Sequence, residues 1–206
     1  PVSEMLKGIR AQAEEAGFAT ELFFLADPGM TPVRLRGILI ARGIKGVVVA
    51  PYASGVGTLD MDVDGFCAAT AGYSIVRPQL HRACPNYLQM MDELIDHLQL
   101  RHFQRIGLVM TYSQGGIGHK LLTSSYLFYQ SLLPSRERIP VLPRERVNAR
   151  DIAAWLRRHR PDVVIGSGRV FTLLQGMGIS IPSDMPFANL DLSEPPRQAA
   201  GMDHRY

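Results

Sequence analysis

The stretch Gly46-Val47-Val48-Val49-Ala50-Pro51 decides the fold class, because it is a short apolar run between a glycine and a proline. Strands of this kind are typical of parallel sheets, in which helices cover both faces. Residues 32–42, which precede it, have the pattern of a helix that starts after the N-cap Thr31 and ends at Gly43. A helix that leads into a buried strand is part of a β-α-β unit.

The same alternation of helix and strand continues in both directions from this stretch. Helical periodicity is expected over 5–16, 32–42, 62–70, 86–100, 116–133, 149–160 and 170–177. Strands are expected over 18–25, 46–51, 72–76, 105–110, 139–142, 163–166 and 187–192. Such an order predicts an α/β fold built from parallel sheets with right-handed crossovers.

Composition excludes several classes of protein. Of the 206 residues, 46% are hydrophobic and 20% are charged, so the chain can bury enough apolar surface to fold. The longest apolar runs are far shorter than the roughly 18 residues of a membrane-spanning helix. Cys67 and Cys84, the two cysteines, are too few for a disulfide scaffold or a four-thiolate zinc site. A net charge of +3 is too small to indicate nucleic-acid binding by these residues.

No motif for catalysis or for a cofactor is complete. Gly55-Val56-Gly57 follows a strand but lacks the third glycine of a dinucleotide-binding turn. The glycines of 115–118 lead to Lys120 without the spacing of a phosphate-binding loop, and no Ser or Thr follows that lysine. Gly166-Ser167-Gly168 lacks the spacing of a nucleophile elbow, and the histidines form no metal-binding pair. We therefore expect a binding protein with no cofactor, no metal and no enzymatic activity.

A series of short motifs along the chain has a recognisable order and spacing. They are Gly8-Ile9 with Ala16-Gly17-Phe18, then 42–51, 103–109 (FQRIGLV), 160–165 (RPDVVI), 178–184 (GISIPSD), 187–191 (FANLD) and 200–203 (AGMD). Together they resemble the effector-binding core of the lactose/galactose-repressor (LacI/GalR) family of bacterial transcription regulators. His102 departs from the pattern, because glycine is usual at that position in the family.

The resemblance implies a fold of two doubly wound parallel-sheet lobes, like that of type I periplasmic binding proteins, with a ligand cleft between the lobes. It places an N-terminal lobe over residues 1–84 and a C-terminal lobe over 85–201. Residues 202–206 would begin the return crossover to the first lobe. The family's helix-turn-helix domain and first core strand would precede residue 1. We expect a cytoplasmic homodimeric repressor that contacts its DNA operator through that domain, under allosteric control by a small effector.

Candidate effector-binding residues follow from the family and from the rule that ligands bind beyond the carboxyl ends of parallel strands. Asp191 matches the family's ligand-binding aspartate, and a carboxylate suits the hydroxyls of a sugar. The other candidates follow predicted strands or begin the next helix or the crossover: Tyr52, Arg77, Tyr112, Gln114, His119, Lys120, Ser167 and His204.

Two departures from the family affect the predicted effector. The family's arginine early in the long helix is absent, and His119 or Lys120 would replace it without the planar fork of arginine. Arg77 stands where a polar or acidic ligand of sugars is common, which suggests an effector with a negative charge or a phosphate. In the alternative interpretations, Arg77 pairs with a surface carboxylate and Asp191 is a structural cap.

Two other functions remain open at this stage. A periplasmic sugar receptor for transport or chemosensing shares the fold and would carry a signal peptide in place of the helix-turn-helix domain. An enzyme with a flavodoxin-like or Rossmann fold is the other alternative, and the incomplete phosphate-binding and nucleophile motifs argue against it.

Overall fold

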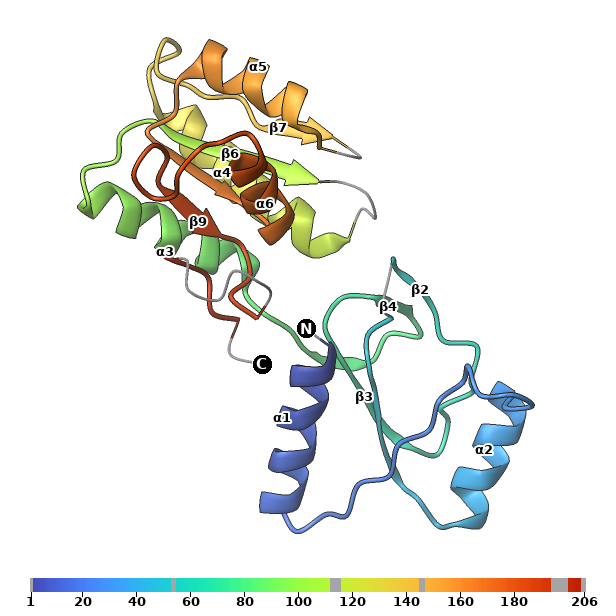
Figure 1. The fold of residues 1–206 in the computed structure, drawn as a ribbon. Helices are drawn as coiled ribbons and strands as arrows, with labels where there is room; N and C mark the ends of the chain where they lie inside the picture. Colours follow the sequence, from blue (N-terminus) through green and yellow to red (C-terminus); the bar gives the residue numbers. More distant parts are fainter. Residues whose placement is uncertain (1, 53–54, 112–115, 145–146, 194–199, 205–206) are drawn as a thin grey trace. The chain divides into compact units, whose positions relative to one another are not determined.

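The computed structural model describes residues 2–52, 55–111, 116–144, 147–193 and 200–204. The chain divides between Pro85 and Asn86 into two compact units, and the ribbon in Figure 1 follows each of them. Among the described residues, no helix combines the length and the apolar character needed to cross a membrane. Each unit is described separately below.

The second unit is built on one sheet of parallel strands. The sheet has the order β10-β9-β8-β6-β7, and the neighbouring strands pair in parallel. Its elements are α3 (Tyr87–Leu100), β6 (Ile106–Thr111), α4 (Ile117–Leu132), β7 (Leu142–Arg144), α5 (Ala149–His159), β8 (Val163–Gly166), α6 (Gly168–Gly176), β9 (Phe187–Asn189) and β10 (Ala200–Gly201).

Helices cover both faces of this sheet, because successive strand side chains point to opposite sides. Ile106, Leu108 and Met110 pack with residues of α3 and α4 in one buried cluster. Val109 and Val164, which alternate with them in the sheet, pack with α5 and α6 in a second cluster. The prediction of an α/β fold with a doubly wound parallel sheet is confirmed here.

Side-chain caps start several helices where the sequence predicts a helix. The Asn148 side chain accepts a hydrogen bond of 2.9 Å from the backbone N–H of Asp151 at the start of α5. The Asn86 side chain caps α3 in the same way. Thr31 accepts from the N–H of Arg34 at 3.1 Å and is followed by Pro32 at the first helical position of α2. Caps of this type satisfy N–H groups that have no partner inside the helix.

In its described residues, the first unit contains two helices and two small parallel sheets. The sheets have the orders β1-β3-β5 and β2-β4. Leu35 and Leu39 of α2 form its buried core with Leu59, Met61 and Ile75. Its elements are α1 (Val2–Glu15), α2 (Pro32–Ala41), β1 (Gly46–Val49), β2 (Gly57–Thr58), β3 (Cys67–Ala71), β4 (Ile75–Arg77) and β5 (His81–Ala83).

Three predictions for the first unit are wrong. Residues 18–25 form no strand, and 62–70 form no helix but lead into β3. Val48 was expected inside the sheet, yet 52% of it is exposed. The edge strand β1 explains part of this, because it pairs only with β3 among the described strands. Residues 18–25 pair with no strand in the described part of the chain, whereas pairing with β1 makes 67–71 a strand despite its helical pattern.

Gly107 in β6 gives a first test of the packing. A Cβ atom at this position would lie 2.4 Å from Cη2 of Trp155 and 3.1 Å from Cβ of Pro161. We expect Gly107→Ala to lower the free energy of unfolding by about 1–3 kcal/mol, because the indole ring must move within a packed core. Denaturant unfolding measures the change.

Gly176→Ala is the matched control, because it lies at the end of α6 with no atom within 4 Å of the added Cβ. Its free energy of unfolding should stay within about 0.5 kcal/mol of the original value. Equal stability of the two variants would contradict the packing of Trp155 against β6.

Candidate functional site

The carboxyl ends of β6, β8 and β9 form one edge of the second unit's sheet. Because β8 pairs in parallel with both of its neighbours, the segments that follow the three strands lie at this edge. Ser167 follows β8 directly, and Asp191 lies two residues after the end of β9. His119 is in the first turn of α4, the helix after β6. The structure therefore brings three of the predicted residues to one edge.

Asp191 orders the turn in which it lies. One of its carboxylate oxygens accepts a hydrogen bond of 2.8 Å from the backbone N–H of Ser193. Its own N–H donates to the side-chain oxygen of Asn189 at 3.4 Å. The side chain is half-buried. These bonds agree with the structural role considered for Asp191, and a carboxylate has enough lone pairs to accept ligand hydroxyls as well.

His119 contributes a buried nitrogen at the start of α4. Its Nδ1 atom is buried and has no hydrogen-bond partner among the described residues. Burial lowers the pKa of the imidazole from its usual 6.5, so the ring is neutral at pH 7. A buried polar atom without a partner is uncommon in folded proteins, and a ligand hydroxyl or a water molecule could satisfy it.

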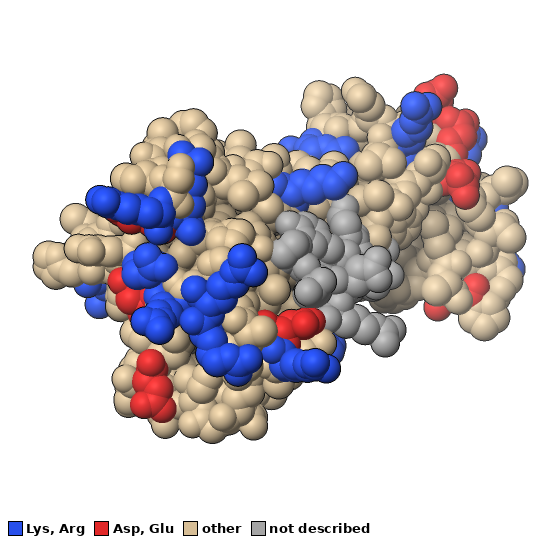
Figure 2. Space-filling view, turned by 90° about the horizontal axis from the view of Figure 1, so that it is seen from above, with Lys and Arg blue, Asp and Glu red and all other residues tan. Residues whose placement is uncertain are grey.

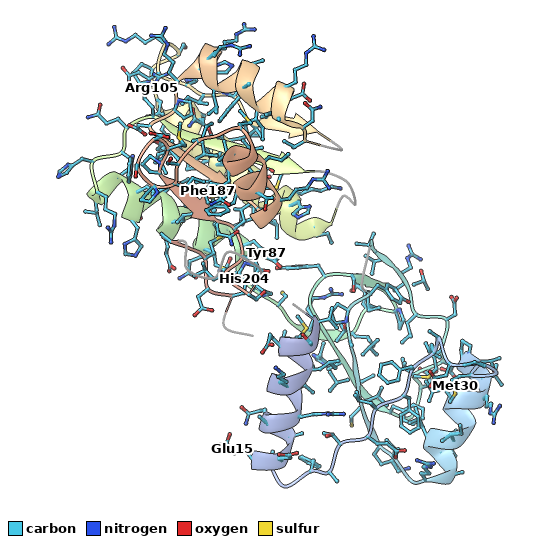
Figure 3. All side chains as sticks on the ribbon, viewed as in Figure 1. Glu15, Met30, Tyr87, Arg105, Phe187 and His204 are labelled. Carbon is cyan, nitrogen blue, oxygen red and sulfur yellow. The ribbon has the colours of Figure 1, made fainter. Side chains whose placement is uncertain are left out.

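His204 and Tyr87 lie together at the same edge, as their labelled side chains show in Figure 3. Nε2 of His204 is 2.8 Å from the carbonyl oxygen of Leu190, the residue before Asp191. The rings of His204 and Tyr87 meet edge to face, with their centroids 5.5 Å apart. Gly118 leaves room for this arrangement, since a Cβ atom there would lie 2.6 Å from the Tyr87 ring.

Sequence reasoning missed three residues of this edge. Tyr87 follows the N-cap of α3, and only its aromatic character at a helix start could have suggested a role. Asn189 is fully buried as the last residue of β9, so a polar residue in an apolar run was an available signal. The buried Oγ of Ser193 has no hydrogen-bond partner among the described residues, and the sequence contains no sign of this.

The remaining predictions for the second unit have different outcomes. Lys120 lies on α4 with its side chain exposed. Tyr112 and Gln114 lie outside the described residues. In the described part of the chain, no three His, Cys, Asp or Glu side chains are arranged to hold a metal ion.

Tyr52 and Arg77 belong to the first unit and are linked through Thr58. The hydroxyl of Tyr52 donates to the carbonyl oxygen of Thr58 at 2.8 Å, and Thr58 pairs with Arg77 between β2 and β4. Arg77 lines an open depression of about 400 Å³, together with Pro78 and residues 58–64. That lining includes three aspartates, at positions 60, 62 and 64, beside the single guanidinium of Arg77.

Comparisons by sequence give no result, because neither a family model nor a curated protein matches this chain. Comparisons by structure, in contrast, find solved structures that match this chain. A LacI transcriptional regulator from a Rhodococcus species matches with a TM-score of 0.65 and 15% identity, over 98% of this chain and 79% of that one. The chain has the fold of LacI-type regulators.

Two further solved structures with this fold contain sugars. A periplasmic binding protein/LacI transcriptional regulator from Alkaliphilus metalliredigens, complexed with D-xylulofuranose, has a TM-score of 0.60 and 15% identity over 92% of this chain and 72% of its own. A LacI family transcriptional regulator from Lactobacillus casei, with bound glucose, has a TM-score of 0.53 and 16% identity. The match covers 94% of this chain and 76% of that one. At sequence identities this low, the structural similarity shows a shared fold and nothing more.

His119 gives the test of this edge. Because its pKa is lower in the folded state than in the unfolded chain, the unfolded chain binds more protons as the pH falls below 7. The contribution of the neutral His119 ring to the free energy of unfolding is fully present above pH 6.5, and it is lost as the pH falls through the folded-state pKa. We expect His119→Gln to remove this part of the pH dependence.

Denaturant unfolding of both proteins between about pH 7 and pH 5 measures the difference in slope. Titration of the His119 ring by NMR gives the pKa directly. Parallel stability curves for the two proteins, or a ring pKa above 6.5, would contradict the buried position of His119.

Proposed function

We propose that this chain is the ligand-sensing core of a LacI-type transcription regulator and binds a small neutral sugar or sugar derivative. The observation that carries the proposal is the position of Asp191, Ser167 and His119 at the carboxyl edge of one parallel sheet. Ligands of open α/β sheets bind at this edge. The sugars in two structures of the same fold support this ligand class.

The side chains at this edge suit the hydroxyls of a sugar. The carboxylate of Asp191 accepts hydrogen bonds from neighbouring hydroxyls, and Ser167 can both donate and accept. Ser167 is the N-cap residue of α6, yet its side chain makes no capping hydrogen bond. The unpartnered Nδ1 of His119 supplies one more group. Each group can accept or donate to a hydroxyl without requiring charge on the ligand.

The charge of the effector is the point at which the proposal departs from the sequence-based hypothesis. Arg77 suggests an anion, but three aspartates line the same depression. Among the described residues, Arg36 pairs with Asp62 at 3.1 Å, and Arg77 forms no ion pair. The surroundings of Arg77 thus carry more negative than positive charge and disfavour a phosphate. We therefore propose a neutral effector.

In this proposal, effector binding controls DNA binding through the arrangement of the two units. The ligand must bind one arrangement better than the other for any shift to occur. Coupling of this kind is typically about 1–3 kcal/mol. The protein would act as a cytoplasmic homodimer without a cofactor or enzymatic activity, and a helix-turn-helix domain outside these 206 residues would contact the operator.

Asp191→Asn is the direct test of the ligand site. Isothermal titration against D-xylulose, D-glucose and related pentoses and hexoses should identify a sugar that binds the original chain. The variant should bind that sugar at least about tenfold more weakly, because an amide accepts fewer hydrogen bonds than a carboxylate. Asp96→Asn, at an exposed position of α3, is the matched control and should retain the original affinity.

Thermal unfolding separates loss of binding from loss of the Asp191–Ser193 turn. Equal affinity of the original chain and Asp191→Asn, with both folded, would contradict the proposed site.

Arg77→Ala distinguishes neutral from anionic effectors. A neutral sugar should bind this variant within about threefold of the original affinity, whereas a sugar phosphate held by the guanidinium would lose at least about tenfold. Titration of both ligand classes into the variant gives the answer. Tight binding of a sugar phosphate that depends on Arg77 would overturn the neutral-effector proposal.

An exported sugar receptor is the second candidate, because a periplasmic binding protein is named in one structure with this fold. The coding sequence upstream of residue 1 separates the two. A basic helix-turn-helix segment supports the regulator. A charged start followed by an apolar stretch and a small-residue cleavage site supports the receptor.

A further inference from the structure

The solvent side of α5 carries arginine side chains at helical spacing. Arg150, Arg157 and Arg158 are exposed, and their i, i+7 and i+8 spacing places them in one stripe along the helix. The sides of α5 that carry Ile152 and Trp155 are buried against the sheet. We call the three exposed arginines the α5 arginine face.

The stability of α5 does not account for all of these arginines. Cations in the last turn of a helix interact favourably with its dipole, which would explain Arg157 and Arg158. Arg150, however, lies in the first turn, where the dipole disfavours a positive charge. At the other end, Arg105 already donates to the carbonyl oxygens of His159 and Arg160. The α5 arginine face is therefore available for a role outside the helix.

The positive charge of this face is not neutralised by its surroundings. In the described part of the chain, none of the three arginines forms an ion pair. Asp151, beside the face, accepts a hydrogen bond of 3.0 Å from the side chain of Asn148. Asp162, which follows the helix, accepts from the backbone N–H groups of Gln104 and Arg105. Figure 2 looks onto α5, the uppermost helix of this unit in Figure 1, and shows lysine and arginine side chains gathered there.

His159 senses the positive field at the end of the face. Burial lowers the pKa of its imidazole, and the positive charges of Arg158 and Arg105 lower it further. The ring is therefore neutral at pH 7. The cations that disfavour a charged imidazole attract an anion to the same place.

The α5 arginine face lacks the apolar groups that a protein or membrane partner would need. Among the described residues, no large apolar side chain of α5 is exposed. Protein interfaces depend on apolar and aromatic anchors at their centre, and a helix that binds a membrane surface inserts its apolar side. That side of α5 is covered by the sheet. A second copy of this chain would bring like charges together at a two-fold contact. The partner class that remains is a polyanion.

We propose that the α5 arginine face binds the phosphate backbone of nucleic acid, without preference for base sequence. Guanidinium groups bind phosphate oxygens in a bidentate manner, and such contacts carry no sequence information. From Arg150 to Arg158 the helix rises about 12 Å. A DNA duplex presents about seven phosphates over that length. Each of the three arginines can therefore reach a phosphate of its own.

This inference goes beyond the proposed function and does not rest on it. The operator would be read by a helix-turn-helix domain outside these 206 residues, whereas the α5 arginine face would add contacts to any duplex nearby. The net charge of +3 gives no sign of this face, because carboxylates elsewhere in the chain offset its arginines. None of the three arginines belongs to the candidate ligand site, so their replacement should leave sugar binding unchanged.

A fluorescein-labelled DNA duplex of arbitrary sequence and about 24 base pairs is the probe. Its binding to the 206-residue chain is measured by fluorescence anisotropy between about 50 and 200 mM salt. We expect saturable binding with a Kd of roughly 1–100 µM at the lowest salt concentration. The logarithm of the association constant should fall with the logarithm of the salt concentration, with a slope of about −2 to −3.

The double variant Arg157→Gln, Arg158→Gln should bind at least about tenfold more weakly at about 50 mM salt. Its slope should be less steep by about 2, because two phosphate contacts are lost. Arg10→Gln with Lys45→Gln is the matched control, since it removes the same charge from exposed positions of the first unit. The control should keep the Kd within about threefold. Circular dichroism and thermal unfolding show whether each variant is folded.

The His159 ring reports where the duplex binds. Bound phosphates would offset the positive charges of Arg158 and Arg105, so the pKa of His159 should rise when NMR titration is repeated with excess duplex. The variant His159→Gln assigns the resonance. An unchanged pKa in the presence of bound duplex would place the binding elsewhere and overturn the proposal.

Other outcomes also overturn it. One is the absence of saturable binding at about 50 mM salt. Another is equal weakening in the Arg157, Arg158 variant and in the control, which would show only an effect of net charge. If poly-glutamate of equal charge displaces the duplex as well as unlabelled DNA does, the face binds acidic proteins instead. Binding to vesicles of phosphatidylcholine and phosphatidylglycerol that depends on Arg157 and Arg158, without duplex binding, would assign it to membranes.

Discussion

The pairing of β6, β8 and β9 in parallel, with apolar side chains on both faces, is the constraint on which the second unit depends. Each strand contributes alternate residues to two separate clusters, so neither helix layer can shift without disturbing the strands beneath it. Since β8 and β9 end together, at the paired residues Gly166 and Asn189, the same pairing positions Ser167 and Asp191. The site is therefore a product of the sheet and not of the loops alone.

Backbone bonds extend this order beyond the strands. The N–H of Leu190 donates to the carbonyl oxygen of Gly166 at 2.9 Å, and the N–H of Leu192 donates to that of Met202 at 2.9 Å. Residues on either side of Asp191 are thus tied to the sheet before any ligand arrives. Preorganisation of this kind lowers the entropic cost of binding, which suits recognition of a small, strongly hydrated molecule.

The sequence predicts the second unit well and the first unit less well, for a physical reason. Two local signals agree with the tertiary structure: the continuous apolar run of 163–166, which forms a buried strand, and the Asn148 cap, which starts α5. In the first unit, residues 18–25 and 67–71 have patterns that do not determine their pairing. Strand formation there depends on a neighbouring strand, which local patterns do not reveal.

For the site, strand ends were predictable and side-chain environments were not. The position of Asp191 follows from the end of an apolar strand, and its carboxyl-edge location is what the fold requires. The burial of His119 and the contact between Tyr87 and His204 depend on packing between α3, α4 and the segment after β10. No spacing in the sequence encodes those contacts, because Tyr87 and His204 are 117 positions apart (204 − 87).

The two bonds at Asp191 have a consequence for how such a site can diversify. In the proposed site, the Asp191 side chain both orders its own turn and binds the ligand, so most replacements would damage the fold before they altered ligand preference. The Ser167 side chain makes no capping hydrogen bond, so its replacement removes no such bond from the fold. During evolution or laboratory selection, new ligand preferences should therefore arise first at Ser167, while Asp191 persists across variants with different ligands.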